Sequence, residues 1–277
     1  MNVLVTGANG KLGTALRQVS RSSDDRWLFT DIVSVRGLDT LYLDVTNTDA
    51  LRLTVESEKI QVVVNCADDP SLPDLLRGTV PSELARIAAA AGMVLFHFSW
   101  ADVFGDNLSI PQQESFPAHP SSPEGAAALQ GEKAILSSGC KAFIFRTQWL
   151  YGLLGGSVVT PFLRGCGKKV PSDVLGTPTS APELAALVGN IIRRRQWDKA
   201  GLYHYSGEGA ASLYDVACAI REAGDGGAFP RPCRAQGGPS CTLLDKSKVC
   251  KSFGISIPHW YTSLKNCMLE WNHSLKK

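Results

Sequence analysis

Apolar and polar positions follow two different periods through the first half of the chain. Short apolar runs predict buried strands over residues 2–5, 27–30, 41–43, 62–65, 94–99 and 142–146. Between these runs, apolar residues recur at helical spacing, which predicts helices over residues 14–20, 49–58, 82–91 and 125–137. Thr48-Asp49 is a candidate N-cap and Gly92 a candidate C-cap. This alternation predicts an α/β fold, a doubly wound parallel sheet of the Rossmann type with right-handed crossovers.

The pattern loosens after about residue 152. Glycines and prolines interrupt it, although residues 182–194 and 212–223 keep helical spacing and residues 201–206 form a strand-like run. The Gly- and Pro-rich stretch 224–240 predicts a long loop. We therefore predict a Rossmann-like core over residues 1–152 and a smaller C-terminal substrate-binding lobe over residues 153–277, interleaved into one continuous fold.

Composition and charge narrow the classes of function. The 28 basic and 26 acidic residues leave a net charge of +2, which implies no nucleic-acid partner. No apolar run approaches the roughly 20 residues of a transmembrane helix, and the first strand begins too early for a signal peptide. We therefore expect a cytoplasmic protein without a membrane partner. The eight cysteines form no C-x-x-C pair, so we predict no metal site; a disulfide near the C-terminus stays open.

A glycine-rich loop follows the first strand, with the sequence TGANGKLG over residues 6–13. Gly7 permits a tight turn, Gly10 lets the backbone approach a pyrophosphate, and Gly13 lets the next helix pack on the sheet. The N–H groups at the start of that helix suit a phosphate. We predict that NAD or NADP binds here. The alternative is a vestigial loop that holds the fold and binds nothing.

Residues at the ends of later strands extend this predicted site. Asp31 follows the second strand, where a carboxylate suits a ribose diol and disfavours a ribose phosphate. Asp44-Val45 follow the third strand, at the position of an adenine edge, and Asn65-Cys66-Ala67 lie at the end of the fourth, where small residues line a dinucleotide. Ordinary turn and strand-end chemistry is the alternative for both segments. The predicted cofactor-binding residues are Gly7, Asn9, Gly10, Lys11, Leu12, Gly13, Asp31, Asp44, Val45, Cys66 and Ala67.

With these residues placed, the whole chain resembles the extended short-chain dehydrogenase/reductase superfamily. The branch that it resembles is that of dTDP-4-dehydrorhamnose reductase and of the regulatory beta subunit of methionine adenosyltransferase. Six segments carry the resemblance: VLVTGANGKLG (3–13), VVVNCA (62–67), GEKA (131–134), FRTQWLYG (145–152), GTPT (176–179) and GLYHYSG (201–207). The resemblance implies the same fold and a bound dinucleotide.

The chain departs from this resemblance where the chemistry is expected. The resemblance places a catalytic threonine at Trp100, a proton-transferring tyrosine at Glu124, and the lysine that lowers the pKa of that tyrosine at Ala128. The loop after Asn65 is short, and Arg77 takes the place of an asparagine that opens the next helix. These departures predict that ordinary ketone reduction has been lost.

Trp100, Asp102 and Glu124 are the predicted catalytic residues of a remodelled pocket. Two carboxylates beside an aromatic wall suit general acid/base work, because burial raises the pKa of one and leaves the other low. Trp100 also suits stacking on a flat or cationic ligand. His97 or His119 would complete the cleft. The alternatives are that both carboxylates are solvated loop residues and that His97 is a core histidine.

Substrate-binding residues are predicted at the start of the C-terminal lobe. They are Arg146, Thr147, Trp149 and Tyr151, in a region that contacts substrate in the proteins that the chain resembles. Arg146 suits a carboxylate or phosphate, with a structural ion pair as its alternative. Tyr151 is a candidate surrogate acid.

Three classes of function follow from this reading. The favoured one is a non-redox small-molecule enzyme, of the cyclase, isomerase or lyase type, that binds NAD(P)(H) in an atypical reductase fold. The first alternative is a catalytically silent regulatory subunit. The second is an NAD(P)H-dependent reductase with a substitute proton donor. The predicted partner is a small-molecule ligand, with a homodimer or a regulatory partner protein left open.

Overall fold

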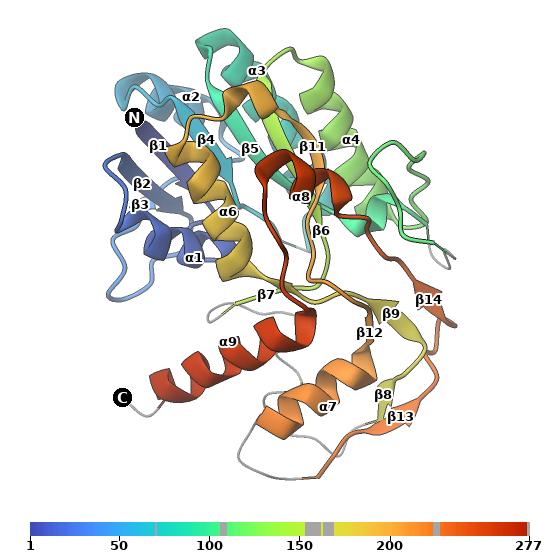
Figure 1. Cartoon of the computed structure of the whole chain (residues 1–277). Helices are drawn as coiled ribbons and strands as arrows, with labels where there is room; N and C mark the ends of the chain where they lie inside the picture. The colour runs from blue at the N-terminus through green and yellow to red at the C-terminus, as the bar shows by residue number, and fades with distance from the viewer. Residues whose placement is uncertain (70, 106–109, 153–161, 163–168, 224–227, 276–277) are drawn as a thin grey trace.

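The centre of the molecule is a parallel sheet of seven strands in the order β11-β6-β5-β4-β1-β2-β3 (Figure 1). A computed structural model describes residues 1–69, 71–105, 110–152, 162, 169–223 and 228–275. The strands of this sheet are β1 (Asn2–Thr6), β2 (Arg26–Asp31), β3 (Leu41–Tyr42), β4 (Val62–Asn65), β5 (Val94–Trp100), β6 (Lys141–Thr147) and β11 (Gly201–His204). The predicted α/β fold with a doubly wound parallel sheet is confirmed.

Helices cover both faces of the sheet, because successive strand residues point to opposite sides. Val3 and Val5 of β1 belong to an apolar cluster with α1, α6 and α8, whereas Leu4 belongs to a cluster with α2, α3 and α4. The helices are α1 (Lys11–Ser20), α2 (Thr48–Ser57), α3 (Val80–Ala91), α4 (Pro123–Ser137), α6 (Ala181–Arg193) and α8 (Ser247–Phe253). The two-sided covering leaves the carboxyl ends of the strands as the edge where a ligand can bind.

The helix ends follow local chemistry, with two departures from the predicted boundaries. Asn47, one residue before the predicted cap, is the N-cap of α2, and its Oδ1 accepts the Ala50 N–H at 3.0 Å. Gly92 ends α3 with φ of 65°, as predicted. A π-helix, η1 (Asp74–Thr79), precedes α3 and was not predicted.

A smaller unit lies below the sheet in Figure 1 and is built around α7 (Leu213–Ala223) and α9 (Trp260–Leu275). Its short strands form separate small sheets. They are β7 (Leu150–Tyr151), β8 (Lys169–Pro171), β9 (Val174–Gly176), β10 (Thr179–Ser180), β12 (Ala211–Ser212), β13 (Arg231–Cys233) and β14 (Ser240–Cys241). The prediction of one long loop over 224–240 is therefore wrong where β13 pairs with β8; residues 224–227 lie outside the described part.

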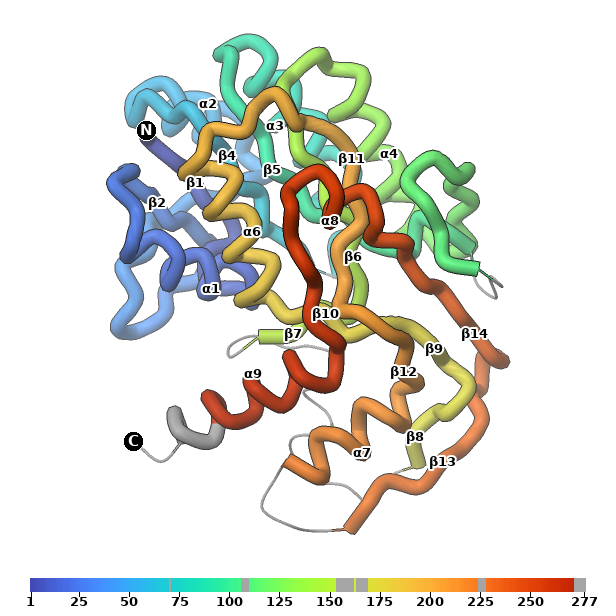
Figure 2. Tube along the Cα trace, viewed as in Figure 1, coloured from blue at the N-terminus to red at the C-terminus, as the bar shows by residue number. Residues whose placement is uncertain are grey.

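The second half of the chain contributes to both units. Figure 2 shows α6, β11 and α8 lying with the sheet, although β7 to β9 and α7 of the lower unit flank them in sequence. β11 pairs with β6 and forms one edge of the sheet. The boundary near residue 152 stays a prediction.

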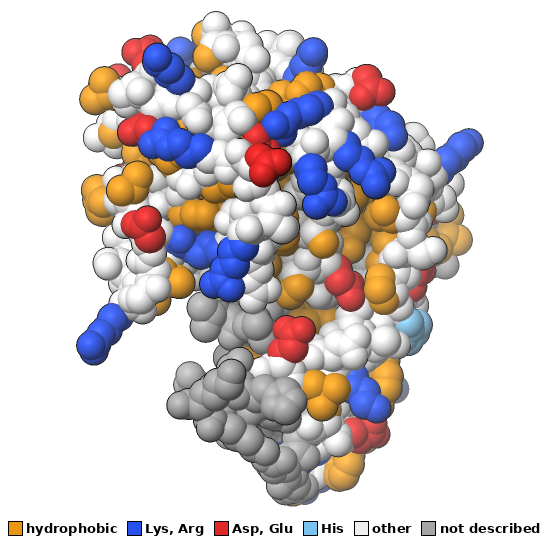
Figure 3. Space-filling model, turned by 60° about the vertical axis from the view of Figure 1, so that its left-hand side comes forward, with side chains coloured by type: hydrophobic (Ala, Val, Ile, Leu, Met, Phe, Trp, Pro, Cys, Tyr) orange, Lys and Arg blue, Asp and Glu red, His pale blue; other side chains and the backbone are white. Residues whose placement is uncertain are grey.

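The surface carries no separated block of one charge on the face shown in Figure 3, where basic and acidic side chains are interspersed. Among the helices that the structure describes, none combines the length and the apolar composition needed to span a membrane. Seven of the eight cysteines fall in the described residues, and none of these seven is in a disulfide.

Candidate functional site

The glycine loop joins β1 to α1 at the carboxyl edge of the sheet. Gly7 has φ of +59°, and a Cβ there would lie 2.6 Å from the backbone of Ala67, two residues after the end of β4. A Cβ on Gly13 would lie 2.5 Å from the backbone of Ala8. By contrast, a Cβ on Gly10 would meet only the Gly7 carbonyl oxygen, at 3.3 Å, so its open side faces away from the protein. This arrangement exposes the N-terminus of α1, which suits a phosphate.

An open pocket of about 790 Å³, here called the Asp31 pocket, lies on one side of this loop. Apolar side chains of Ile32, Leu43, Leu72 and Leu76 form much of its wall. Seven of the predicted cofactor-binding residues line it: Gly7, Gly10, Asp31, Asp44, Val45, Cys66 and Ala67. An apolar slot with a few fixed polar groups is typical of a small-molecule site.

Asp31 is held in place by the backbone of two loops. Its Oδ2 accepts the Asn9 N–H at 3.0 Å, and its Oδ1 accepts the Val33 N–H at 3.1 Å. The Asn9 side chain does not line either pocket described here; its amide donates to the Val33 carbonyl at 2.5 Å and its Oδ1 accepts from Arg17 and Thr40. Asn9 therefore fixes the loop that carries Asp31.

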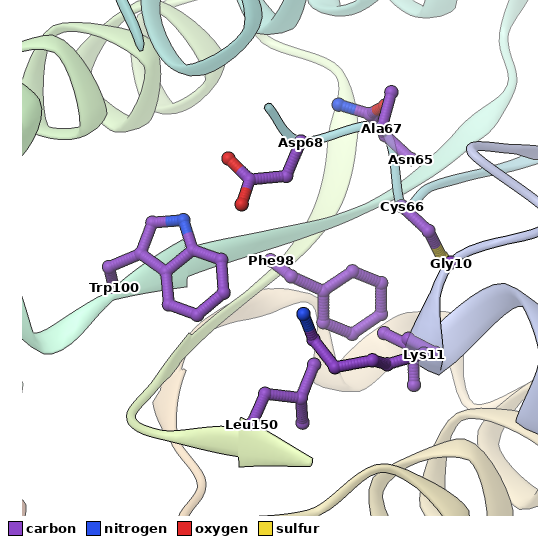
Figure 4. A pocket seen from close by; sticks show the side chains of 10 residues that line it. Gly10, Lys11, Asn65, Cys66, Ala67, Asp68, Phe98, Trp100 and Leu150 are labelled. Atoms are coloured by element: carbon purple, nitrogen blue, oxygen red, sulfur yellow. The ribbon is translucent and has the colours of Figure 1, made fainter. Parts of the chain in front are cut away.

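A second open pocket of about 500 Å³, here called the Trp100 pocket, adjoins the first (Figure 4). The two share Gly10, Cys66, Ala67 and Asp68. The Trp100 pocket is lined in addition by Lys11, Leu12, Asn65, Phe98, Trp100 and Leu150. The pockets thus form one continuous depression across the glycine loop, from β2 and β3 to β5 and β7.

The polar side of the Trp100 pocket holds a lysine and an ion pair. Figure 4 shows the Lys11 amine pointing into the pocket, between the Trp100 indole and the Phe98 ring. Burial lowers the pKa of Lys11 below its ordinary value, and the Asp68 charge opposes this shift. Asp68 Oδ1 accepts from Arg77 Nε at 2.9 Å, and the Arg77 guanidinium lies 5.1 Å from the Trp100 ring centroid. The cation over Trp100 is therefore one of the protein's own side chains.

A buried hydrogen-bond chain supports the pocket from behind. Thr6 Oγ1 donates to Asn65 Oδ1 at 2.7 Å, and Asn65 Nδ2 lies 3.3 Å from His97 Nδ1. His97 is buried, and burial lowers its pKa to about 4. His97 is thus a neutral core histidine, whereas His119 lies exposed in a loop.

The structure separates the three predicted catalytic residues. Trp100 lines the pocket, but Asp102 is exposed in a 3₁₀ turn, η2 (Ala101–Val103), and Glu124 is half-buried in the first turn of α4. Neither carboxylate is among the residues that line the Trp100 or Asp31 pockets. The expectation that all three share one cavity does not agree with this geometry. The catalytic roles themselves stay predictions.

The start of α4 packs too closely on η2 to leave a cavity between them. A Cβ on Gly125 would lie 2.1 Å from the Asp102 carbonyl oxygen. One turn further, Ala128 is buried in an apolar cluster with Ala101, Val103, Phe104 and Leu244. At the position where the resemblance places a lysine, the protein therefore has packed apolar side chains.

Arg146 is not among the residues that line the Asp31 or Trp100 pocket. It is 4% exposed, and its guanidinium donates to both carboxylate oxygens of Glu132, with the shortest distance 2.7 Å. Ser99 also donates to Glu132, at 2.5 Å, and His204 Nε2 lies 3.4 Å from Arg146. Because Glu132 takes the Nε and Nη2 donors of Arg146, the structure favours the alternative of a structural ion pair, and the substrate-binding role stays a prediction.

The other predicted substrate-binding residues lie at the junction of the two units. Thr147 and Tyr151 are buried, and Tyr151 packs in the core of the lower unit with Val216 and Trp260. Burial raises the pKa of the Tyr151 hydroxyl, which makes it a poor surrogate acid. Trp149 is half-buried and has a positive φ of 45°. None of these three lines the Trp100 pocket.

Three lining residues of the Trp100 pocket were not predicted: Asp68, Phe98 and Leu150. Phe98 had a signal in the sequence, because residues two apart in a strand share a face and Trp100 follows it in β5. Asp68 lies in the short loop after Asn65. Leu150 lies far from the others in sequence, so only the fold brings it to the site.

Comparisons with known proteins find a family model and several named reductases. The model of the RmlD substrate binding domain matches residues 1–272. The chain is 28% identical over 301 residues to dTDP-4-dehydrorhamnose reductase of Escherichia coli K12, covering 98% of each. It is 32% identical over 234 residues to a probable dTDP-4,6-dihydroxy-2-methyloxan-3-one 4-ketoreductase of Streptomyces antibioticus, covering 78% of this chain and 75% of that protein.

Solved structures show the same fold. The crystal structure of a dTDP-4-dehydrorhamnose reductase from Clostridium acetobutylicum superposes with a TM-score of 0.86 at 27% identity, covering 100% of both chains. The Bacillus anthracis dTDP-4-dehydrorhamnose reductase in complex with NADP superposes with a TM-score of 0.82 at 22% identity, covering 97% of this chain and 99% of that one.

These relatives overturn the favoured prediction of function. Proteins similar over nearly the whole chain are named reductases, so the prediction of a non-redox cyclase, isomerase or lyase is wrong, and so is the silent regulatory subunit. The contradicted prediction rested on Trp100, Glu124 and Ala128; that these residues replace catalytic ones stays a prediction. The reductase alternative is the one that agrees with these names.

Proposed function

Because the chain belongs to the RmlD substrate binding domain family, as its motifs predicted, we propose that it reduces a ketone of a nucleotide-linked deoxysugar with NADH or NADPH. One observation carries the proposal: the Asp31 and Trp100 pockets form a continuous depression across the glycine loop. The relatives named above, a 4-dehydrorhamnose reductase and a 4-ketoreductase, supply the class of substrate.

The residues present fit a dinucleotide laid across the loop. The apolar Asp31 pocket suits the adenosine, with the Asp31 carboxylate placed for a ribose diol. The open face of Gly10 and the N-terminus of α1 suit the pyrophosphate. The Trp100 pocket then takes the nicotinamide end, between Phe98 and Leu150. When bound, the reduced nicotinamide supplies a hydride to the carbonyl carbon of the ketone.

The charge of Asp31 favours NADH over NADPH. Its carboxylate is fixed by the Asn9 and Val33 N–H groups and cannot swing away from a 2′-phosphate without losing both hydrogen bonds. The Asp31 carboxylate and a phosphate on the ribose 2′-oxygen are both negative, so they repel each other. We expect NADH to bind roughly tenfold more tightly than NADPH, which corresponds to about 1.4 kcal/mol.

Calorimetric titration and a spectrophotometric assay test this function. NADH, NADPH and ADP-ribose are titrated into the protein, and absorbance at 340 nm is followed after adding dTDP-4-dehydrorhamnose. We expect binding of all three and oxidation of NADH that depends on the sugar. Gly10→Val should abolish binding, because its side chain fills the space for the pyrophosphate. Absence of binding up to millimolar ligand, or binding without turnover, would contradict the proposal.

A further inference from the structure

We propose that Lys11 is the catalytic acid of this site, and that its ammonium group gives the proton to the carbonyl oxygen of the ketone. This inference rests on the proposed reductase function and deepens it. By sequence, Lys11 belongs to the glycine loop. Its side chain, however, lies in the pocket assigned to the nicotinamide end rather than on the adenosine side.

The position of Lys11 follows from its place in the chain. It is the first residue of α1 and comes directly after Gly10, so its backbone lies beside the phosphate cradle. Its side chain extends from there into the Trp100 pocket, where the amine points between the Trp100 and Phe98 rings (Figure 4). The ammonium group therefore stands where a nicotinamide and a ketone would meet.

Lys11 is also the best proton donor of this pocket. Among the described residues that line it, three side chains carry ionisable groups: Lys11, Cys66 and Asp68. Burial raises the pKa of the Cys66 thiol, so the thiol holds its proton. Asp68 accepts hydrogen bonds from Arg77 Nε and Nη2, at 2.9 and 3.4 Å, an arrangement that suits a carboxylate anion.

The environment of Lys11 makes its ammonium group a stronger acid than that of an ordinary lysine. Burial between apolar rings lowers the pKa of Lys11, and a less basic amine releases its proton more readily. Asp68 opposes the shift and keeps the ammonium form accessible. The positive charge also faces the oxygen on which negative charge develops during reduction. The two exposed or half-buried carboxylates, Asp102 and Glu124, lie outside this pocket.

The step balances with the groups already named. The carbonyl carbon accepts a hydride, with its electron pair, from the bound reduced dinucleotide, and the carbon–oxygen π bond breaks. The carbonyl oxygen takes the proton from Lys11 Nζ. The products are an alcohol, the oxidised dinucleotide and a neutral Lys11 amine, which regains its proton from water.

Two variants of Lys11 and a matched control test the assignment. Lys11→Met removes the proton and the charge, and Lys11→Arg keeps the charge on a group that does not release a proton. Lys141→Met is the control, because Lys141 is exposed and begins β6 opposite Val94, at the other end of β5 from Trp100. We expect both Lys11 variants to lose roughly 10²- to 10⁴-fold in kcat and the control to keep wild-type kcat.

The pH profile and amine rescue separate proton donation from a structural role. Reduction needs the protonated amine, so wild-type kcat should hold at pH below the Lys11 pKa and fall as pH rises through it. Lys11→Met should lose this limb, and added methylammonium should restore part of its kcat. Circular dichroism and thermal unfolding check that each variant is folded.

Chemical labelling gives a readout that does not depend on turnover. Acetylation of Lys11 is measured by mass spectrometry with no ligand, with ADP-ribose and with NADH. We expect NADH to protect Lys11 more than ADP-ribose does, because only NADH fills the nicotinamide end. A different set of results would overturn the inference. ADP-ribose and NADH would protect Lys11 equally, and Lys11→Met would lose the same affinity for both ligands while its kcat stayed unchanged. Lys11 would then be assigned to the pyrophosphate.

Failure of the function and failure of the inference look different. If the wild-type protein binds NADH but turns over no ketone, the proposed function is contradicted and the role of Lys11 with it. If the wild-type protein is active and Lys11→Met retains its kcat, only the inference is contradicted. Activity lost in Lys11→Met without a change in the pH profile would also overturn it.

Discussion

At the scale of single residues, two glycines of the same loop serve different purposes. A Cβ on Gly13 would lie 2.5 Å from the Ala8 backbone, whereas a Cβ on Gly10 would meet one carbonyl oxygen at 3.3 Å. We expect Gly13→Ala to lower the free energy of unfolding by about 1–3 kcal/mol, because helix α1 must move off the loop. Gly10→Ala should change it by less than about 1 kcal/mol and still weaken NADH binding.

Urea denaturation and calorimetry of the two variants decide this pair. Each variant is the control for the other, since both add one methyl group three residues apart. The assignment of roles fails if Gly10→Ala is the more destabilised protein or if it binds NADH as the wild-type protein does.

At the scale of elements, one buried ion pair joins α4 to β6. The Glu132 side chain is 1% and the Arg146 side chain 5% exposed, and Ser99 of β5 adds a third contact. We expect Glu132→Gln and Arg146→Met each to lower the free energy of unfolding by about 3–5 kcal/mol, because each leaves a buried group without its partner. The double variant should lose much less than the sum.

A double-mutant cycle measured by urea denaturation checks the coupling. If Arg146 instead bound substrate, Arg146→Met would unfold like the wild-type protein and would raise KM. Additive losses below about 1 kcal/mol would show that the pair does not hold the two elements together.

At the scale of the whole molecule, buried histidines make stability depend on pH. Burial lowers the pKa of His97 to about 4 and that of His204 to about 3, the charge of Arg146 adding to the second shift. Below about pH 6.5 the unfolded chain binds protons that the folded protein does not, so the free energy of unfolding should fall as pH falls from about 6.5 toward 4.

Asp25 adds a second loss at lower pH. Hydrogen bonds from Arg195 and the chain's amino group lower the pKa of Asp25 to about 2, against desolvation. Its contribution is therefore complete above about pH 4 and lost as pH falls toward 2. Urea denaturation at a series of pH values checks both windows. His97→Gln should flatten the slope between pH 6.5 and 4, and His119→Gln should not; a constant stability from pH 7 to 5 would contradict the account.

The partner and the location of the whole molecule remain predictions. A small-molecule ligand agrees with the two pockets, and it is proposed above as a dinucleotide and a sugar ketone. Three of these predictions rest on the sequence alone: a homodimer, a regulatory partner protein and a cytoplasmic location. Size-exclusion chromatography with light scattering would measure the oligomeric state directly.

The sequence by itself determined the fold class and the glycine loop. Strand and helix periods are local, and Gly7 and Gly13 carry a requirement for close backbone packing that no other residue meets. Caps such as Gly92 are local as well. Six such segments together indicated the family, and the match of the RmlD substrate binding domain model to residues 1–272 confirmed it.

Only the tertiary structure decided which side chains share the site. Arg146 pairs with Glu132, and Asp102 and Glu124 do not line either pocket. Leu150 lines the Trp100 pocket although it is distant in sequence from the other lining residues. The Gly- and Pro-rich stretch likewise gains β13 through pairing with the distant β8. Each outcome depends on a partner far away in sequence, and the free energy of a contact or of burial belongs to the pair rather than to either residue. The glycine loop therefore indicated where a ligand binds, but the sequence did not predict all the side chains that line the pocket.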